Sequence, residues 1–204
     1  MGLLSPTASM TRYKVTGNIE NSIKETILKG LKKFCIADIE NENFEKSVGW
    51  TSFDNPFNPD FDGMKFEIGS FFLFSMRIDK KNLSSKIIQK HFSIEYARQA
   101  KKNGRDYLSK NEKKSLKEHV VSVLTLRIPS TPNVYDLLWN YETGSLYFFS
   151  TLKLANEEVE TLFFKSFNLS LVRLFPYTMA ELLLDLSDVE KDVILNLSPT
   201  KFTD

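Results

Sequence analysis

Three residues of this chain, Asp60, Asp79 and Lys81, follow the order found in one class of magnesium-dependent nuclease. In that PD…(D/E)xK pattern, two carboxylates hold Mg²⁺ and the lysine helps to orient the hydrolytic water. The pattern is short and arises often by chance. Asp60 also lies in a turn-rich loop over residues 53–63, where aspartate commonly caps the backbone. A Mg²⁺-dependent nuclease is therefore the alternative interpretation, and we expect no catalytic residue.

No other pattern in the chain predicts an active site. Cys35 is the single cysteine, which excludes an internal disulfide and a multi-cysteine zinc site. The two histidines, His91 and His119, have no carboxylate-rich neighbours, and a catalytic zinc needs three protein ligands. The sequence also lacks a glycine-rich phosphate loop, GxSxG and HExxH. We expect a protein without enzymatic activity, cofactor, metal or small-molecule substrate.

A cluster of cations predicts a different chemistry, the binding of phosphate groups. Each such cation can lie near a phosphate, and several together release counterions, so that binding is strongest at low salt and independent of base sequence. Few acidic residues oppose the cluster, which argues against a merely solvated helix surface. The expected DNA-binding residues are Lys101, Lys102, Arg105, Lys110, Lys113, Lys114 and Lys117.

The net charge of +1 conceals this asymmetry. The whole chain has 27 Lys and Arg against 26 Asp and Glu. Between Arg77 and Arg127, 14 basic residues face 5 acidic ones, and the remainder of the chain has 13 against 21. A basic block within an acidic protein indicates a polyanionic partner, such as a nucleic acid.

Two helices must position these cations. Apolar spacing predicts helices near 84–102 and 110–126, separated by a break at Asn103-Gly104. Ser109 and Glu112 have the spacing of a capping box at the start of the second helix. We expect an antiparallel pair in which Lys113, Lys114 and Lys117 are exposed and three apolar residues are buried, namely Leu116, Val120 and Leu124.

The remaining pattern predicts an α+β fold, with antiparallel hairpins packed against helices. Trp50 and Trp139 border apolar patches and are expected in the core. The expected elements are a strand at 11–17, a helix at 18–34, hairpins at 64–68/71–78 and 134–141/146–150, a helix opening at Asn156, a strand at 169–174 and a short helix after Ser187.

We divide the chain into an N-terminal extension (1–9), a main domain (10–178) and an acidic segment (179–204) that holds a short helix. The longest apolar runs are far too short to cross a bilayer. The first ten residues lack the features of a signal peptide. A cytoplasmic protein without membrane contact is expected.

The order of these features resembles the RdgC family of recombination-associated proteins, over about residues 10–176. The similar segments are MTRYKVTG (10–17), FCIADIENENFEKSVGW (34–50), RIDKKNLSSKIIQKHF (77–92), KKNGRDYLSKNEKKSLKEHVVSVLTLRIP (101–129), Trp139 with Gly144, and STLKLANEEVETLFFKSF (150–167). The basic segment at 101–129 is the most specific of them.

This resemblance implies DNA binding without sequence preference, dimerisation into a ring around the duplex, and modulation of RecA-dependent recombination at the nucleoid. An exonuclease label has been given to the family, but its motifs provide no catalytic residues to carry over. Family members are longer, and their C-terminal third contributes to ring closure, so we expect a dimer at best. A third interpretation is a protein-interaction paralogue that no longer binds DNA, in which the lysines are scattered instead of forming one positive face.

Overall fold

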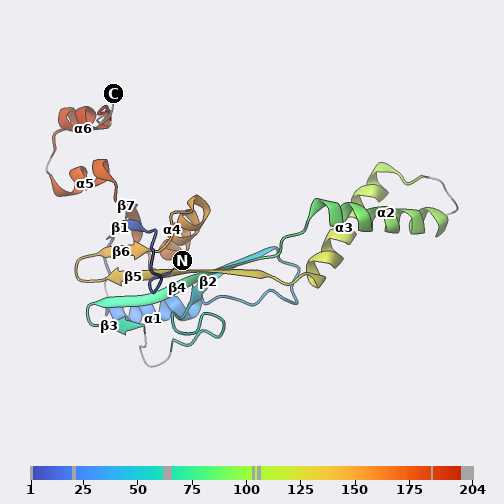
Figure 1. The fold of residues 1–204 in the computed structure, drawn as a ribbon, viewed down its shortest axis with the longest axis horizontal. Helices are drawn as coiled ribbons and strands as arrows, with labels where there is room; N and C mark the ends of the chain where they lie inside the picture. The colour runs from blue at the N-terminus through green and yellow to red at the C-terminus, as the bar shows by residue number, and fades with distance from the viewer. Residues whose placement is uncertain are drawn as a thin grey trace.

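The computed structural model describes residues 2–19, 22–61, 66–102, 104, 107–184 and 186–198. A body built on a curled antiparallel sheet has two projections, a helical arm (α2 and α3) and, on the opposite side, a pair of short helices (α5 and α6) (Figure 1). The expected α+β class is confirmed. In chain order the elements are β1 (Thr11–Thr16), α1 (Ile23–Lys33), β2 (Lys46–Thr51), β3 (Glu67–Ile68), β4 (Phe71–Lys80), α2 (Ser85–Lys102), α3 (Lys110–Arg127), β5 (Thr131–Asn140), β6 (Ser145–Phe148), α4 (Lys153–Phe167), β7 (Ser170–Arg173), α5 (Pro176–Leu183) and α6 (Asp188–Leu195).

The described strands form one half-barrel sheet in the order β2-β4-β5-β6-β1-β7, with the short β3 paired to β4. Every pairing is antiparallel. β4 and β5 pair over their whole length, from Phe71 opposite Asn140 to Lys80 opposite Thr131. The arm is inserted between these two strands, so its two ends enter and leave the body side by side (Figure 1).

Two tight turns show why the hairpins form where the sequence places them. Gly69, between β3 and β4, has φ +60°, and Gly144, before β6, has φ +63°. Residues other than glycine rarely adopt this left-handed conformation. Both expected hairpins are therefore present, although β3 has only two residues.

The core of the body is an aromatic cluster between the sheet and the helices α1 and α4. The Trp50 ring stacks on Phe167 with centroids 5.8 Å apart, and Trp139 meets Phe163 edge-on at 5.2 Å. The expected burial of both tryptophans is confirmed, with exposed fractions of 0% and 2%. α1 approaches α4 closely at Gly30, where a Cβ atom would lie 2.5 Å from the Phe167 ring.

The structure adds one strand that was not expected and corrects where two helices begin. β2 was not expected, because its sequence KSVGWT follows a polar run and lacks a clear alternation. α1 begins at Ile23 instead of Asn18. α4 begins at Lys153 and not at Asn156, which lies inside the first turn of the helix. The Asn156 side chain is buried. It accepts a hydrogen bond from Tyr13 Oη at 2.6 Å and donates one to the Leu152 carbonyl oxygen.

None of the helices in the described part of the chain combines the length and the apolar composition needed to cross a bilayer.

Candidate nucleic-acid interface

The arm has a small apolar core of its own, separate from that of the body. Leu116, Val120 and Leu124 of α3 are buried, as expected from their spacing. They pack with Leu108 and, from α2 and the residues before it, with Leu83, Ile88, Phe92 and Tyr96. The two helices thus form the expected antiparallel pair (Figure 1).

The start of α3 is fixed by the capping box that the sequence predicts. The Glu112 amide donates to Ser109 Oγ at 3.3 Å, and the Ser109 amide donates to Glu112 Oε2 at 2.7 Å. In the same connection, the Leu108 amide donates to Tyr96 Oη of α2 at 3.2 Å. These bonds hold the first turn of α3 against the far end of α2, where the lysines concentrate.

Six of the seven expected DNA-binding residues are described, and all six side chains are exposed; they are Lys101, Lys102, Lys110, Lys113, Lys114 and Lys117. Arg105 lies outside the described residues. The four lysines of α3 follow the spacing i, i+3, i+4 and i+7, which places them along one side of its first two turns. Because α2 and α3 are antiparallel, the two lysines that end α2 lie near the beginning of this row.

Among the described residues, most of these cations have at most weak intramolecular partners. Lys114 lies 4.0 Å from Glu118 in an exposed ion pair, which contributes little to stability. Lys113 Nζ lies 5.5 Å from the centre of the Tyr96 ring. Their charges therefore remain available to an external anion.

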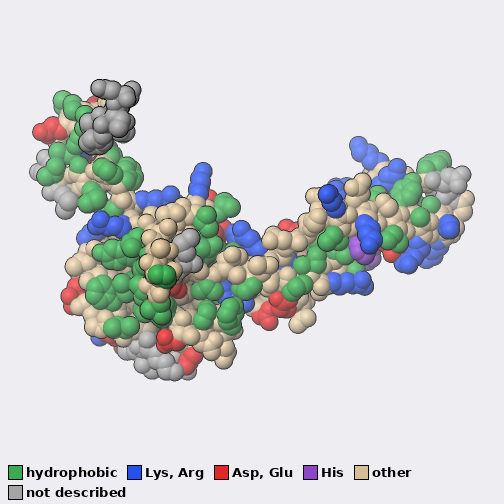
Figure 2. Space-filling model, in the orientation of Figure 1, with side chains coloured by type: hydrophobic (Ala, Val, Ile, Leu, Met, Phe, Trp, Pro, Cys, Tyr) green, Lys and Arg blue, Asp and Glu red, His purple; other side chains and the backbone are tan. Residues whose placement is uncertain are grey.

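Positive charge also extends beyond this row. Across α2 and α3 there are ten Lys and Arg residues against three Glu. Figure 2 shows blue Lys and Arg side chains at both the upper and the lower edge of the arm. The arm is thus positively charged on more than one side.

The base of the arm is fixed by Lys81, a residue of the nuclease pattern. Its side chain is buried, and Nζ donates to the carbonyl oxygens of Glu40, Glu42 and Thr125, each at 3.0 Å. Beside it, the Glu40 carboxylate accepts hydrogen bonds from the hydroxyl and the amide of Ser130, which lower the pKa of that carboxyl. These contacts tie both ends of the arm to the segment before β2.

Asp79, the second residue of that pattern, also has an internal partner. Its carboxylate is completely buried and accepts from Arg77 Nε at 2.7 Å and Arg77 Nη2 at 2.5 Å. The two oxygens that would coordinate Mg²⁺ are thus both bonded to a guanidinium group. Within the described ranges, no group of three or more His, Cys, Asp or Glu side chains is placed to hold a metal ion.

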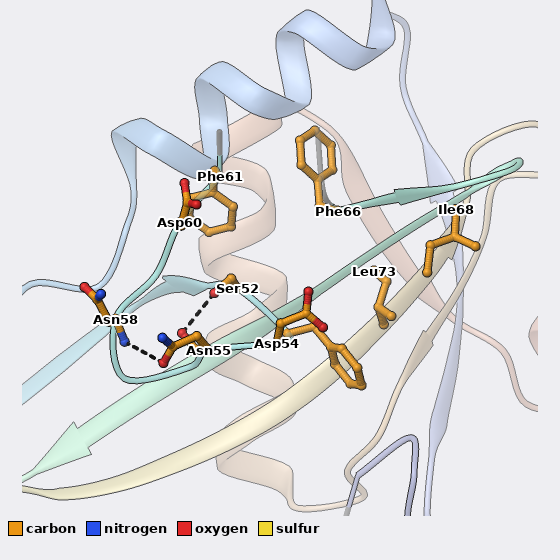
Figure 3. Close-up of a pocket in the computed structure, with 10 residues that line it drawn as sticks. Ser52, Asp54, Asn55, Asn58, Asp60, Phe61, Phe66, Ile68 and Leu73 are labelled. Atoms are coloured by element: carbon orange, nitrogen blue, oxygen red, sulfur yellow. Dashed lines mark hydrogen bonds between the residues drawn. The ribbon is translucent and has the colours of Figure 1, made fainter. Parts of the chain in front are cut away.

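Asp60, the first residue of the pattern, belongs to a different surface. It is exposed at a cavity of about 380 Å³ under the loop after β2, beside apolar residues that include Phe61, Phe66 and Leu73 (Figure 3). Neither Asp79 nor Lys81 is among the described residues that line this cavity. The sequence spacing suggested one site, whereas the fold gives Asp79 and Lys81 separate structural contacts and leaves Asp60 in a surface loop.

The structure also reveals three lysines that the sequence interpretation missed. Lys46, Lys80 and Lys153 line a hollow of about 270 Å³ between the sheet and the first turn of α4. Lys46 forms an ion pair with Glu158, which lines the same hollow, so the net charge of the hollow is positive but below +3. These lysines come from β2, β4 and α4, and no local sequence signal could have grouped them.

Comparison with known proteins agrees with the resemblance noted in the sequence. No curated protein matches this chain at a significant level. A family model described as "Putative exonuclease, RdgC" matches residues 8–181, which include the whole sheet and the arm. The match covers most of the 204 residues, and this chain therefore belongs to the RdgC family.

Proposed function

We propose that this chain is a non-enzymatic protein that binds DNA through its phosphates, without preference for base sequence. The observation that carries the proposal is the row of exposed lysines along α3, which continues to the end of α2 on a helix pair that projects from the body. Phosphates are spaced along every duplex irrespective of its bases, so a row of flexible ammonium groups suits the backbone and does not select a sequence.

A second basic surface supports this proposal. The hollow lined by Lys46, Lys80 and Lys153 lies where β4 and β5 lead into the arm. A duplex that contacts the arm can extend toward this hollow, where Lys80 forms no ion pair within the described part of the chain and Lys153 is 3.9 Å from the exposed Glu157. We assign the arm as the main contact and the hollow as an additional one.

The biological setting of this binding is proposed from the family. Modulation of RecA-dependent recombination, a location at the nucleoid and a homodimeric state are the roles that the resemblance implies. The first two require binding to DNA irrespective of sequence, and the charge of the arm supports such binding.

The test is a titration of duplex DNA, followed by fluorescence anisotropy at several salt concentrations. Each lost phosphate contact should reduce the slope of log affinity against log salt by about 0.9. Changing Lys113, Lys114 and Lys117 together to Ala should weaken binding to all sequences alike and flatten the slope by about 2–3. Exposed substitutions of this kind usually change stability by about 0.5 kcal/mol or less, so folding should be retained.

A matched control is available on α1, where Lys29, Lys32 and Lys33 are also exposed. Changing these three to Ala removes the same charge from the body and should leave the slope as in the wild type. Equal affinities and equal slopes for the arm variant and the wild type would contradict the assignment of the interface to the arm.

A nuclease is the second candidate, because the matched family is described by an exonuclease name. The residues of the PD…(D/E)xK pattern do not favour it, since Asp79 is bonded to Arg77 and Lys81 to three carbonyl groups. Binding without cleavage remains the function that the geometry supports best.

A further inference from the structure

The two histidines of this chain lie on the arm and line the same hollow. His91 of α2 and His119 of α3 border a space of about 100 Å³ between the two helices. The chain has no other histidine, and Figure 2 shows purple His atoms on the arm beside blue Lys and Arg side chains. Histidine is the one side chain that ordinarily changes its charge between about pH 5 and 8. The arm therefore carries every group of this kind in the protein.

The histidines lie on a different side of the arm from the row of lysines. Lys117, the last lysine of that row, lines a groove with Ile88 and Phe92 of α2. His119 follows Lys117 by two residues, which places it about 200° further around α3, and it lines two other hollows. We call the surface around these two hollows the histidine flank. Its charged and titratable side chains are those of His91, Glu95, Lys102, Glu112, His119 and Arg127.

The charge of the histidine flank depends on its imidazoles. The smaller hollow is lined by one other cation, Arg127, and one carboxylate, that of Glu95, which also accepts a hydrogen bond from Arg98 at 2.7 Å. The larger hollow, of about 540 Å³, is likewise lined by one cation, Lys102, and one carboxylate, that of Glu112. Among these lining residues the cations and the carboxylates balance. The flank is therefore neutral when the imidazoles are neutral and positive when they are protonated.

The flank also carries donors for an anionic ligand. His119 is exposed and His91 is half-buried, and neither imidazole has a hydrogen-bond or ion-pair partner in the part of the chain that the structure describes. The larger hollow includes three neutral side chains that can donate hydrogen bonds, those of Gln99, Asn111 and Ser115. A protonated histidine donates from both ring nitrogens. Such a set of donors suits phosphate oxygens, which accept hydrogen bonds from side chains of these types.

We propose that the histidine flank is a second phosphate-binding surface of the arm, which engages DNA when His91 and His119 are protonated. This role rests on the proposed function, because it assumes that the row of lysines already holds a duplex. Since Lys117 and His119 lie on nearly opposite sides of α3, one straight duplex does not contact both surfaces. The row of lysines alone binds DNA at about pH 8, and at about pH 5.5 the flank receives a second stretch of DNA.

The first experiment counts how many short duplexes each chain binds, by titration of DNA at protein concentrations well above the dissociation constant. In the wild type, the number bound per chain should double between about pH 8 and about pH 5.5. Both limits lie above the pH at which the Glu40 carboxyl, whose pKa is lowered from 4.5, becomes protonated, so the base of the arm stays intact. His91→Gln with His119→Gln keeps the flank uncharged, and the number should then be the same at both limits.

The lysine variant isolates the flank. Lys113→Ala with Lys114→Ala and Lys117→Ala should bind duplex DNA weakly at about pH 8 and about tenfold more tightly at about pH 5.5, through the added phosphate contacts. Adding His91→Gln and His119→Gln to this variant should remove the gain. Adding His91→Lys and His119→Lys instead is the matched control, because the flank is then positive at both limits and binding should be tight at both. These side chains are exposed or half-buried, so circular dichroism should show an unchanged fold.

The outcomes separate this role from the proposed function. A wild type that binds the same number of duplexes at both limits would overturn the second surface and leave binding through the lysines intact. A gain in acid that persists after both histidines are replaced by Gln would also overturn it, because no histidine then remains in the chain. A wild type that binds no DNA at either limit would overturn the proposed function together with this role.

Discussion

The ammonium group of Lys81 donates a 3.0 Å hydrogen bond to the carbonyl oxygen of Thr125. Lys81 directly follows β4, and Thr125 lies in the last turn of α3, so this bond joins the two ends of the arm. The other two acceptors of the same ammonium group, the carbonyl oxygens of Glu40 and Glu42, belong to the segment before β2. One buried cation thus connects the arm to the body.

Lys81→Met should therefore destabilise the protein. Methionine keeps most of the apolar stem but leaves the buried carbonyl group of Thr125 without this donor, and an unsatisfied buried group costs about 1–3 kcal/mol. The carbonyl groups of Glu40 and Glu42, which are only partly buried, lose the same donor. Urea unfolding followed by circular dichroism should show a loss of at least that size. Lys80→Met, one position earlier and only partly buried, should cost much less. Equal losses for the two variants would contradict the role assigned to Lys81.

The base of the arm should loosen in acid. Hydrogen bonds from Ser130 lower the pKa of the Glu40 carboxyl below its ordinary value of 4.5 in the folded state. A lowered carboxyl pKa stabilises the fold at pH values above the ordinary one, and that contribution is lost as the pH falls through the folded-state pKa. Hydrogen exchange of the arm amides should therefore accelerate, relative to its intrinsic rate, below about pH 4.5.

Two serine variants separate this effect from general acid sensitivity. Ser130→Ala removes the hydroxyl group that donates to the Glu40 carboxylate. It should reduce the pH dependence of the protection of the arm amides from hydrogen exchange. Ser187→Ala removes the same type of donor from Glu190, which is in α6 and whose pKa is lowered in the same way. It should leave the arm unchanged. If both variants altered arm protection equally, Glu40 would not be the group responsible.

The two core tryptophans should differ in what their replacement by Phe costs. Trp50 Nε1 donates to Ser166 Oγ at 2.7 Å, whereas the buried Nε1 of Trp139 has no hydrogen-bond partner among the described residues. Trp50→Phe removes a hydrogen bond, while Trp139→Phe removes an unpaired donor. Trp50→Phe should therefore destabilise the fold more, by about 1–3 kcal/mol in chemical unfolding. The opposite order would show that ring packing dominates at both sites.

Purified protein should leave linear duplex DNA intact in the presence of Mg²⁺ or Mn²⁺. The physical reason is that the Asp79 carboxylate, which would coordinate the metal, is bonded to Arg77 and completely buried. Gel analysis of end-labelled DNA over several hours measures this directly. Degradation that disappears in Asp60→Ala, with a circular dichroism spectrum like that of the wild type, would establish the nuclease instead.

The arm was the part of the fold most readily predicted from the sequence. Ser109 and Glu112 predict where α3 begins, and the spacing of Leu116, Val120 and Leu124 predicts its buried side, because both signals arise within one helix. The expected exposure of the α3 lysines followed from the same periodicity. Short-range patterns are reliable here because the arm has little contact with the rest of the chain.

Features that depend on distant contacts could not be predicted in this way. β2 is a strand because it pairs with β4. Within β2, position 49 must be glycine because a Cβ atom there would lie 2.5 Å from the backbone of Ile36. Lys81 resembles a catalytic residue in sequence, but the partners of its ammonium group lie far along the chain, in Glu40, Glu42 and Thr125. The projection of the arm likewise depends on the long β4–β5 pairing, which no local pattern indicates.

That pairing has a consequence for how this protein can change over evolutionary time. Because Lys80 and Thr131 are opposite each other, residues 81–130 amount to one very long hairpin connection. Away from Lys81 and Ser130 at its base, insertions, deletions and charge changes within it should alter neither the register of the sheet nor the aromatic core, since the arm packs on an apolar cluster of its own. The arm is thus a module that can lengthen, shorten or exchange its ligand while the body is inherited unchanged.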